Sequence, residues 1–185
     1  MAKELSRYKA IPKLVEVFRH YGYEGATLAR LSQATGLGKA SLYHHFPNGK
    51  EEMAAAVLEY IDRGLNEQLL APLQQASDPA NRLRAVAQNI DEFYNHGQQD
   101  CLLALLSIGE ARELFGQQIE RSLTVWIDRL AKVAIESGIN PTTARQRAED
   151  AVLQIQGALV MSRGLNNTAI FKRVLKHLPS MLLSS

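Results

Sequence analysis

The chain has little cysteine and no long apolar run. Its single cysteine, Cys101, excludes both an internal disulfide and a metal site built from several cysteines. The N-terminal stretch MAKELSRYKAIPKL carries charges among its apolar residues and lacks the uninterrupted apolar core of a signal peptide. No charge-free apolar run of about 18 residues is present that could span a bilayer. We therefore expect a cytoplasmic protein without a membrane partner.

Catalytic and cofactor-binding motifs are also missing. The sequence contains no phosphate-binding glycine loop followed by lysine and serine, no nucleophile elbow and no helical pair of zinc-binding histidines. The acidic residues are spread along the expected helices, many of them near basic side chains, a pattern typical of solvated surfaces. We predict that the protein is not an enzyme and that it has no catalytic residue, metal site or cofactor.

What the chain has instead is helical periodicity. Apolar residues make up 46% of the 185 residues, as in an ordinary folded protein. They recur with the α-helical period almost throughout, and no two-residue alternation bounded by hairpin turns appears. Two later helices begin at Asp78-Pro79 and Asn140-Pro141, where a capping side chain precedes a proline. The predicted fold is all-α with about nine helices. The first helix ends at Gly22 and is expected to bury one stripe: Tyr8, Ile11, Leu14, Val15, Phe18 and Tyr21.

Basic charge is concentrated near the N-terminus. Residues 1–50 hold eight basic and three acidic side chains, a net charge of +5. The remaining residues hold thirteen basic and sixteen acidic side chains, a net charge of −3. This asymmetry favours a polyanionic partner at the N-terminal end. A basic face that is merely solvated is the alternative.

The stretch TLARLSQATGLGKASLYHHFPNGKEE, residues 27–52, predicts two short helices separated by a glycine turn. Thr27 can cap the first helix, Gly36 can end it in the left-handed conformation, and Pro47 begins the break after the second. Helices this short are not stable alone, so they must pack on a third helix, as in a helix-turn-helix. The expected core of this motif is Leu31, Leu37, Leu42 and Phe46.

The second short helix, residues 39–46, has an outward face suited to DNA. This face lies on the N-terminal part of the helix, which enters the major groove in a helix-turn-helix. It offers a cation, a small apolar contact and hydrogen-bonding groups: Lys39, Ala40, Ser41, Tyr43 and His44. Phosphates could be held by Thr27, Tyr43 and Lys50. Solvated lysines and a packed tyrosine are the structural alternatives. His44 and His45 are adjacent on a helix and so cannot share one metal ion.

These residues resemble the DNA-binding domain of the TetR (tetracycline-repressor) family of bacterial transcriptional regulators. The similarity covers residues 5–65 and is carried by YEGATLARLSQATGLGKASLYHHFPNGKEEM, in particular SLYHHF followed by a proline and then a lysine with acidic residues. The resemblance implies a DNA-binding domain at residues 1–50 and a helical domain at residues 51–185 that binds a small ligand and pairs two subunits. It also implies DNA contacts by the residues that match DNA-contacting positions of the family: Thr27, Lys39, Ser41, Tyr43, His44 and Lys50.

The match to the family has three departures. Gly38 stands where many members have a serine that caps the recognition helix, and Leu28 stands where some have an arginine that reads a base. The segment PNGK is one residue longer than the commoner form. We therefore expect a less firmly fixed start of the recognition helix and no base contact from Leu28.

The C-terminal region offers candidates for ligand binding and for subunit pairing. The candidate pocket residues are Phe93, Tyr94, Cys101, Phe115, Trp126 and Met161. Ordinary core packing is the alternative for each of them, with Cys101 acting as a small hydrophobe. Polar side chains that could orient a ligand, if they face inward, are Gln88, Asn89, Gln154 and Gln156. The helices from about Pro141 to Met181 are expected to pair two subunits, with close approach allowed by small residues: Ala144, Ala148, Ala151, Gly157 and Ala158.

The residues and the resemblance together predict a transcriptional repressor that binds a palindromic DNA operator as a homodimer. One short recognition helix makes few base contacts, so specific affinity needs two half-sites. A small-molecule effector is expected to release the protein by shifting the helix that begins near Lys50, which changes the separation of the two recognition helices. The alternatives are an activator or ligand-independent DNA-binding protein, and a helical protein-interaction module.

Overall fold

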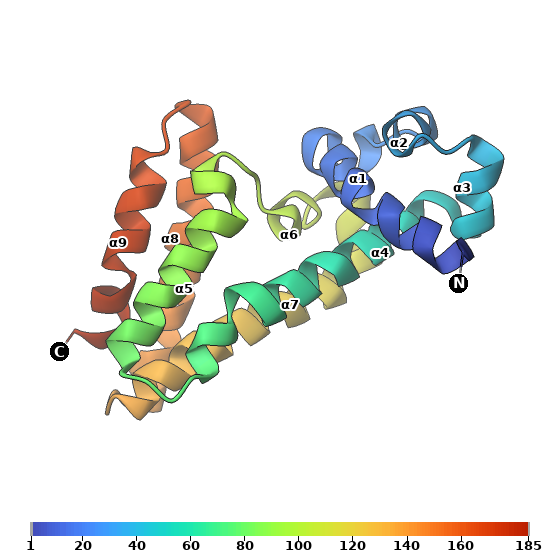
Figure 1. Ribbon diagram of the computed structural model, residues 1–185. Helices are drawn as coiled ribbons and strands as arrows, with labels where there is room; N and C mark the ends of the chain where they lie inside the picture. The colour runs from blue at the N-terminus through green and yellow to red at the C-terminus, as the bar shows by residue number, and fades with distance from the viewer. Residues whose placement is uncertain (1, 185) are drawn as a thin grey trace. The chain divides into compact units, whose positions relative to one another are not determined.

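The computed structural model describes the backbone of residues 2–184 and the side chains of residues 7–184. Over this range the chain is all-α, with short 3₁₀ and π segments, which confirms the predicted fold class (Figure 1). The α-helices are α1 (Ala2–Gly25), α2 (Leu28–Thr35), α3 (Lys39–His45), α4 (Gly49–Gly64), α5 (Pro79–Phe93), α6 (Leu102–Leu105), α7 (Gly109–Glu136), α8 (Pro141–Gly164) and α9 (Ala169–Leu183). A π segment lies at Leu65–Leu69, and 3₁₀ turns lie at Ala71–Gln74 and Asn95–Gly97.

The described residues divide into two compact units. The first contains the chain up to Asp62 together with Leu102–Ile119, and the second contains Arg63–Cys101 and the residues from Glu120 onward. Both α4 and α7 therefore contribute residues to each unit. Within the described range, no helix combines the length and the apolar character that a membrane crossing requires.

The helix α1 is interrupted close to its end. Gly22 has φ 65° and ψ −173°, so regular helix stops at the predicted residue and a further turn continues to Gly25. The middle of the predicted stripe is buried: Ile11, Leu14, Val15 and Phe18. The predicted burial of Tyr8 and Tyr21 is wrong, because they are 56% and 43% exposed. Tyr21 instead lies beneath the guanidinium of Arg30, whose Cζ is 4.0 Å from the ring centroid.

The ends of α2 follow the sequence signals. Thr27 is the N-cap residue, and its hydroxyl oxygen accepts the backbone N–H of Arg30 at 3.4 Å. Gly36 ends the helix with φ 73° and donates its N–H to the carbonyl of Ser32 at 3.0 Å. A residue with a side chain would be strained in this left-handed conformation, so glycine fixes where α2 stops.

The core of the helix-turn-helix is smaller than predicted. Leu31, Leu42 and Phe46 are fully buried, whereas Leu37 is only half-buried. The carbonyl of Leu37 accepts the hydroxyl of Ser32 at 2.6 Å, so a polar contact holds the turn here. Gly38 is the N-cap of α3 and provides no side-chain hydrogen bond, in line with its departure from the family pattern.

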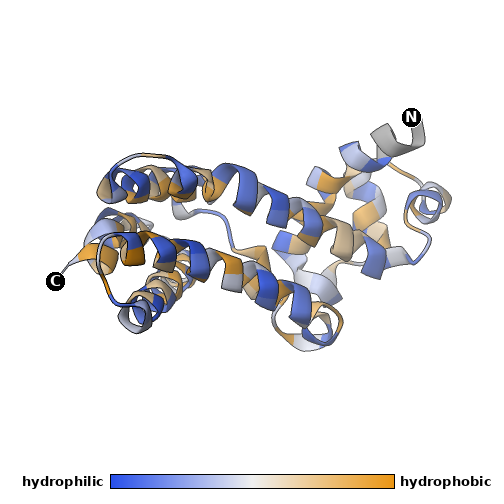
Figure 2. Cartoon of the chain, turned by 90° about the horizontal axis from the view of Figure 1, so that it is seen from below, coloured by the Kyte–Doolittle hydropathy of each residue, from blue (hydrophilic) through white to orange (hydrophobic). Residues whose placement is uncertain are grey.

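The second unit is organised around α9. This helix packs along both α8 and α5 (Figure 1). Most of the helices carry hydrophobic and hydrophilic residues in alternation, as expected of helices that bury one face (Figure 2). The largest fully buried side chains of this unit are Trp126, Tyr94 and Phe171.

The small residues of α8 correct one expectation. Ala144, Ala148, Ala151 and Ala158 are buried within the single chain, so they are not free to line an interface with a second subunit. Of the five predicted small residues, Gly157 alone is exposed. The close approach that the alanines permit is used inside the chain, where α8 packs on α9.

Candidate nucleic-acid interface

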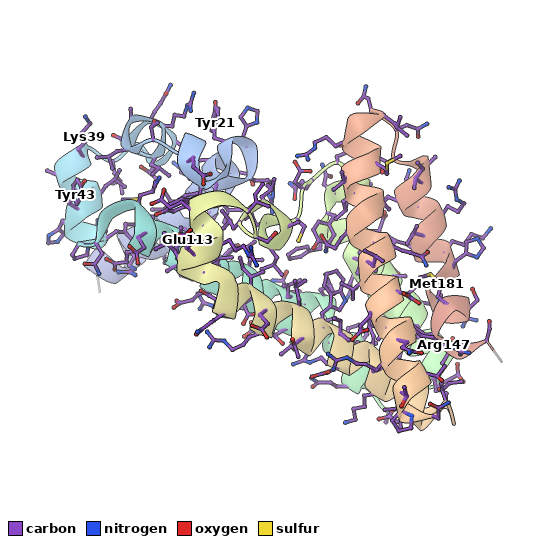
Figure 3. The ribbon with its side chains drawn as sticks, turned by 180° about the vertical axis from the view of Figure 1, so that it is seen from behind. Tyr21, Lys39, Tyr43, Glu113, Arg147 and Met181 are labelled. Atoms are coloured by element: carbon purple, nitrogen blue, oxygen red, sulfur yellow. The ribbon has the colours of Figure 1, made fainter. Side chains whose placement is uncertain are left out.

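The helix α3 presents polar side chains to solvent at its N-terminal end. Lys39, Ala40 and His44 are exposed, Tyr43 is 50% exposed, and Ser41 is half-buried. Lys39 and Tyr43 are labelled in Figure 3, where both lie on α3. The structure therefore brings these five predicted site residues together on one short helix.

The opposite face of α3 is anchored by an arginine from α1. The Nη1 atom of Arg7 donates to the carbonyl of His45 at 2.8 Å and to Oε1 of Glu52 at 2.8 Å. The Arg7 guanidinium also lies 4.7 Å from the centroid of the buried Phe46 ring. The other oxygen of Glu52 accepts the backbone N–H of Asn48 at 3.0 Å. This set of contacts fixes the end of α3 against the start of α4.

Tyr43 lies over the turn between α3 and α4. A Cβ atom at Gly49, which has φ 65°, would lie 3.3 Å from Cε1 of Tyr43. The glycine thus leaves room for the ring while half of the tyrosine surface remains exposed. A tyrosine hydroxyl held on a rigid turn is a suitable phosphate donor.

Lys50 is held more tightly than the sequence indicates. Its Nζ lies 3.9 Å from the centroid of the Tyr23 ring and donates to the Tyr23 carbonyl at 3.3 Å. The side chain is half-buried, whereas Lys39 is exposed. Lys50 therefore has a structural role at the start of α4, and its contact with phosphate stays a prediction.

Tyr23 forms the centre of an aromatic cluster in the first unit. Its ring stacks on Phe18 at 6.3 Å and meets Phe115 edge-on at 5.8 Å between centroids. Burial raises the pKa of the Tyr23 hydroxyl above its ordinary value, and the charges of Glu110, Glu51 and Glu24 act in the same direction. Phe115, predicted as a pocket residue, lies in this cluster of the first unit.

Glu24 caps the start of α7. Its Oε1 accepts the backbone N–H of Glu110 at 2.9 Å. Gly109 is required beside it, because a Cβ there would overlap the Glu24 carboxylate, and its φ is 62°. Neither Glu24 nor Arg7 was identified from sequence, since their partners are 86 and 45 residues away and no local pattern marks them.

Two predicted pocket residues meet in the second unit. The Tyr94 hydroxyl donates to Sγ of Cys101 at 3.4 Å, and both residues are buried. The Tyr94 ring meets Phe93 at 5.1 Å and Phe171 at 6.3 Å, both edge-on. Phe93 is half-buried and also lines a depression of about 270 Å³ beside Leu69. These contacts place Cys101 in the core, the position expected of a cysteine that acts as a small hydrophobe.

Several buried polar groups of the second unit have no hydrogen-bond partner among the described residues. Nε1 of Trp126, both amide atoms of Gln156 and the hydroxyl of Ser162 are among them, and so are Nε of Arg82 and Oδ1 of Asp91. Trp126 and Ser162 belong to the buried set, whereas Met161 is about half exposed on α8. Of the other polar candidates, Gln88 bonds to Glu92, Asn89 bonds to the Gln68 carbonyl, and Gln154 is exposed. An unpaired buried polar group is costly, so these atoms are candidate ligand contacts.

Two family models together match most of the chain. Residues 13–57 match the family described as "Bacterial regulatory proteins, tetR family". Residues 79–177, just over half of the chain, match "Transcriptional regulator LmrA/YxaF-like, C-terminal domain". The chain therefore belongs to the TetR family of helix-turn-helix transcriptional regulators, which are not enzymes. Within that family, its C-terminal domain is of the LmrA/YxaF-like type.

Individual relatives are distant, and some of them match nearly the whole chain. The HTH-type transcriptional regulator LmrA of Bacillus subtilis is 22% identical over 96% of both chains. The nucleoid occlusion factor SlmA of Haemophilus influenzae is 28% identical over 59% of this chain and 48% of its own length. A TetR regulator from Legionella pneumophila superimposes with a TM-score of 0.82 at 16% identity, covering 94% of this chain and 95% of its own. One from Agrobacterium tumefaciens gives 0.82 at 20% identity, covering 98% and 100%. These structures share the fold.

Proposed function

We propose that this regulator is a repressor that binds a palindromic operator as a homodimer and leaves it when a small-molecule effector binds. The observation that carries the DNA-binding part is the two-sided character of α3. Leu42, His45 and Phe46 are buried, while Lys39, Tyr43 and His44 face solvent. A rigid short helix with a cation and hydrogen-bond donors at its N-terminal end suits the major groove.

The exposed face of α8 supports pairing of two copies. Three large exposed apolar residues lie on it, and a fourth follows directly after its end: Leu153, Val160, Met161 and Leu165. Leu153 is 68% exposed and Val160 is 54% exposed in the single chain. Exposed apolar side chains along one helix of a regulator are best covered by the same stripe of a second copy, related by a two-fold axis. We assign the homodimer interface to this stripe.

The unpaired polar atoms of Trp126 and Gln156 support an effector site in the second unit. A ligand that offers one acceptor to Nε1 of Trp126 and one donor and one acceptor to the Gln156 amide would satisfy groups that the described residues leave without partners. We assign DNA binding to residues 1–50 and the effector and dimer functions to residues 51–185. Release then requires the effector to bind one state more tightly than the other, with a coupling of about 1–3 kcal/mol.

Operator selection from random duplexes, using the purified full chain, tests the proposal most directly. The expected result is enrichment of a sequence with two inverted half-sites about 10 base pairs apart, centre to centre. Enrichment of no sequence would favour the protein-interaction module instead. If selection enriches an operator but no tested small molecule weakens its binding, a ligand-independent DNA-binding protein is favoured.

The variant Tyr43→Ala is expected to weaken operator binding by about tenfold, because it removes both the hydroxyl that we propose donates to phosphate and a ring that covers the turn. Tyr43→Phe keeps the ring and is expected to lose a smaller part of the affinity. Fluorescence anisotropy with labelled operator gives both values, and circular dichroism checks the fold. Normal affinity in Tyr43→Ala would remove this residue from the interface.

The variant Lys50→Ala is expected to reduce the slope of log affinity against log salt concentration by about one unit, as for loss of one phosphate contact. Lys39→Ala, on an exposed lysine of α3, provides the comparison. An unchanged slope in Lys50→Ala, together with lower thermal stability, would assign Lys50 only its contacts with Tyr23.

A further inference from the structure

A groove of about 550 Å³ lies between α5 and α9 in the second unit. Its α5 wall is formed by Arg84, Ala87, Gln88 and Asp91, which are spaced as one stripe of a helix. Arg84 is exposed, and its Nη1 bonds to the amide oxygen of Asn81 at 2.6 Å. Its positive charge is therefore not neutralised by that contact.

The α9 wall repeats the same spacing. It is formed by Lys172, Leu175, Lys176 and Pro179. The whole helix, AIFKRVLKHLPSMLL, contains no acidic residue. Both lysines are exposed, and neither belongs to an ion pair among the described residues. The α9 wall therefore contributes two cations, Lys172 and Lys176, and two apolar residues, Leu175 and Pro179.

The single carboxylate among the lining residues, that of Asp91, faces His96. Oδ2 of Asp91 lies 2.6 Å from Nδ1 of His96. Its other oxygen, Oδ1, is buried and has no hydrogen-bond partner among the described residues. The lining therefore combines three cations with one carboxylate, whose Oδ1 is buried, and an apolar floor of Ala87, Leu175 and Pro179.

We propose that this groove binds a small amphipathic organic anion, with its carboxylate between Lys172, Lys176 and Arg84 and its aliphatic body on the apolar floor. The volume lies within the range of about 300–1,000 Å³ that is usual for small-molecule sites. A carboxylate is the complement of exposed cations that lack carboxylate partners of their own.

The residues that line the groove include none of the proposed dimer stripe on α8 and neither of the proposed effector contacts, Trp126 and Gln156. Successive residues of a helix are rotated by about 100°, so the groove residues of α9 lie about half a turn from Ile170, Val174 and Met181. Pairing of two copies through the side of α9 that carries these three residues would leave the groove open. Anion binding here also depends on no part of the repressor proposal, since it can be measured without DNA.

Isothermal titration of the full chain with sodium octanoate tests the proposal, with 1-octanol as the uncharged probe of equal chain length. Wild-type protein is expected to bind octanoate in a salt-sensitive manner and to bind octanol more weakly. The double variant Lys172→Gln/Lys176→Gln is expected to weaken octanoate binding by about tenfold or more. Lys132→Gln, at an exposed lysine of α7 outside the groove, is the matched control and should bind as the wild type does.

Three results would overturn the proposal. They are no octanoate binding, equal binding of octanoate and octanol, and equal binding by the double variant and the wild type. A hexaglutamate peptide, which stands for an acidic protein segment, is titrated as a competitor of octanoate. If the peptide binds to the lysines and octanoate does not, the groove is a docking site for an acidic protein segment, and the small-anion assignment is wrong.

Discussion

Replacing Gly97 with alanine is expected to lower the free energy of unfolding by about 3 kcal/mol. Gly97 is the third of three consecutive residues with positive φ, after Asn95 at 46° and His96 at 58°, and its own φ is 85°. A Cβ atom at this position would lie 2.8 Å from Cδ1 of Phe171, which is fully buried. Two costs therefore add: strain in the left-handed backbone and overlap with a core ring that has no free space.

Urea unfolding followed by circular dichroism measures the effect, with Gly116→Ala as the matched control. Gly116 lies within α7, and a Cβ there would meet nothing within 4 Å. The same chemical change should then stabilise the protein by roughly 0.5–1 kcal/mol, because alanine favours helix. If the two variants were equally stable, the packing of Gly97 on Phe171 would not limit that position.

The helix-turn-helix could be predicted because its signals are local. Thr27 caps α2 three residues before the N–H that it accepts, and Gly36 ends the helix four residues after its own partner, Ser32. Contacts between residues three or four positions apart can be predicted from the residue types in one short stretch of sequence. The outward face of α3 followed in the same way, since burial of Leu42 and Phe46 determines which neighbours face solvent.

Contacts between distant segments could not be predicted in this way. The Arg7 to Glu52 ion pair spans 45 residues, and the Lys50 to Tyr23 contact spans 27. No periodicity in a single sequence pairs these residues. Lys50 shows the consequence: its position at the start of α4 indicated a phosphate contact, whereas the fold also gives its amine a partner within the protein.

The helix α8 shows a second limit of prediction from a single sequence. A stripe of alanines in the sequence indicates that another helix packs closely on it. The sequence does not show whether that helix belongs to the same chain or to a second copy. Here Ala144, Ala148 and Ala151 face inward. The apolar residues left on the outer side, Leu153 and Val160, then become the better candidates for pairing.

If two copies pair as we propose, the variant Leu153→Glu is expected to convert the homodimer to monomers and to lower operator affinity by about a hundredfold or more. Leu153 is 68% exposed in the single chain, so glutamate should not disturb the fold of the protomer. In a two-fold interface, however, the substitution buries one carboxylate from each copy without a partner, which costs several kcal/mol. Loss of the second recognition helix then removes half of the DNA contacts.

Sedimentation velocity gives the oligomeric state, and anisotropy with labelled operator gives the affinity of the same samples. Ile135→Glu is the matched control, because Ile135 is also an exposed apolar residue but lies on α7, outside the α8 stripe. This control should remain dimeric and bind the operator normally. A Leu153→Glu protein that stays dimeric would place the interface elsewhere. A monomer that still binds the full operator tightly would contradict the requirement for two recognition helices, since one short helix would then supply the specific contacts alone.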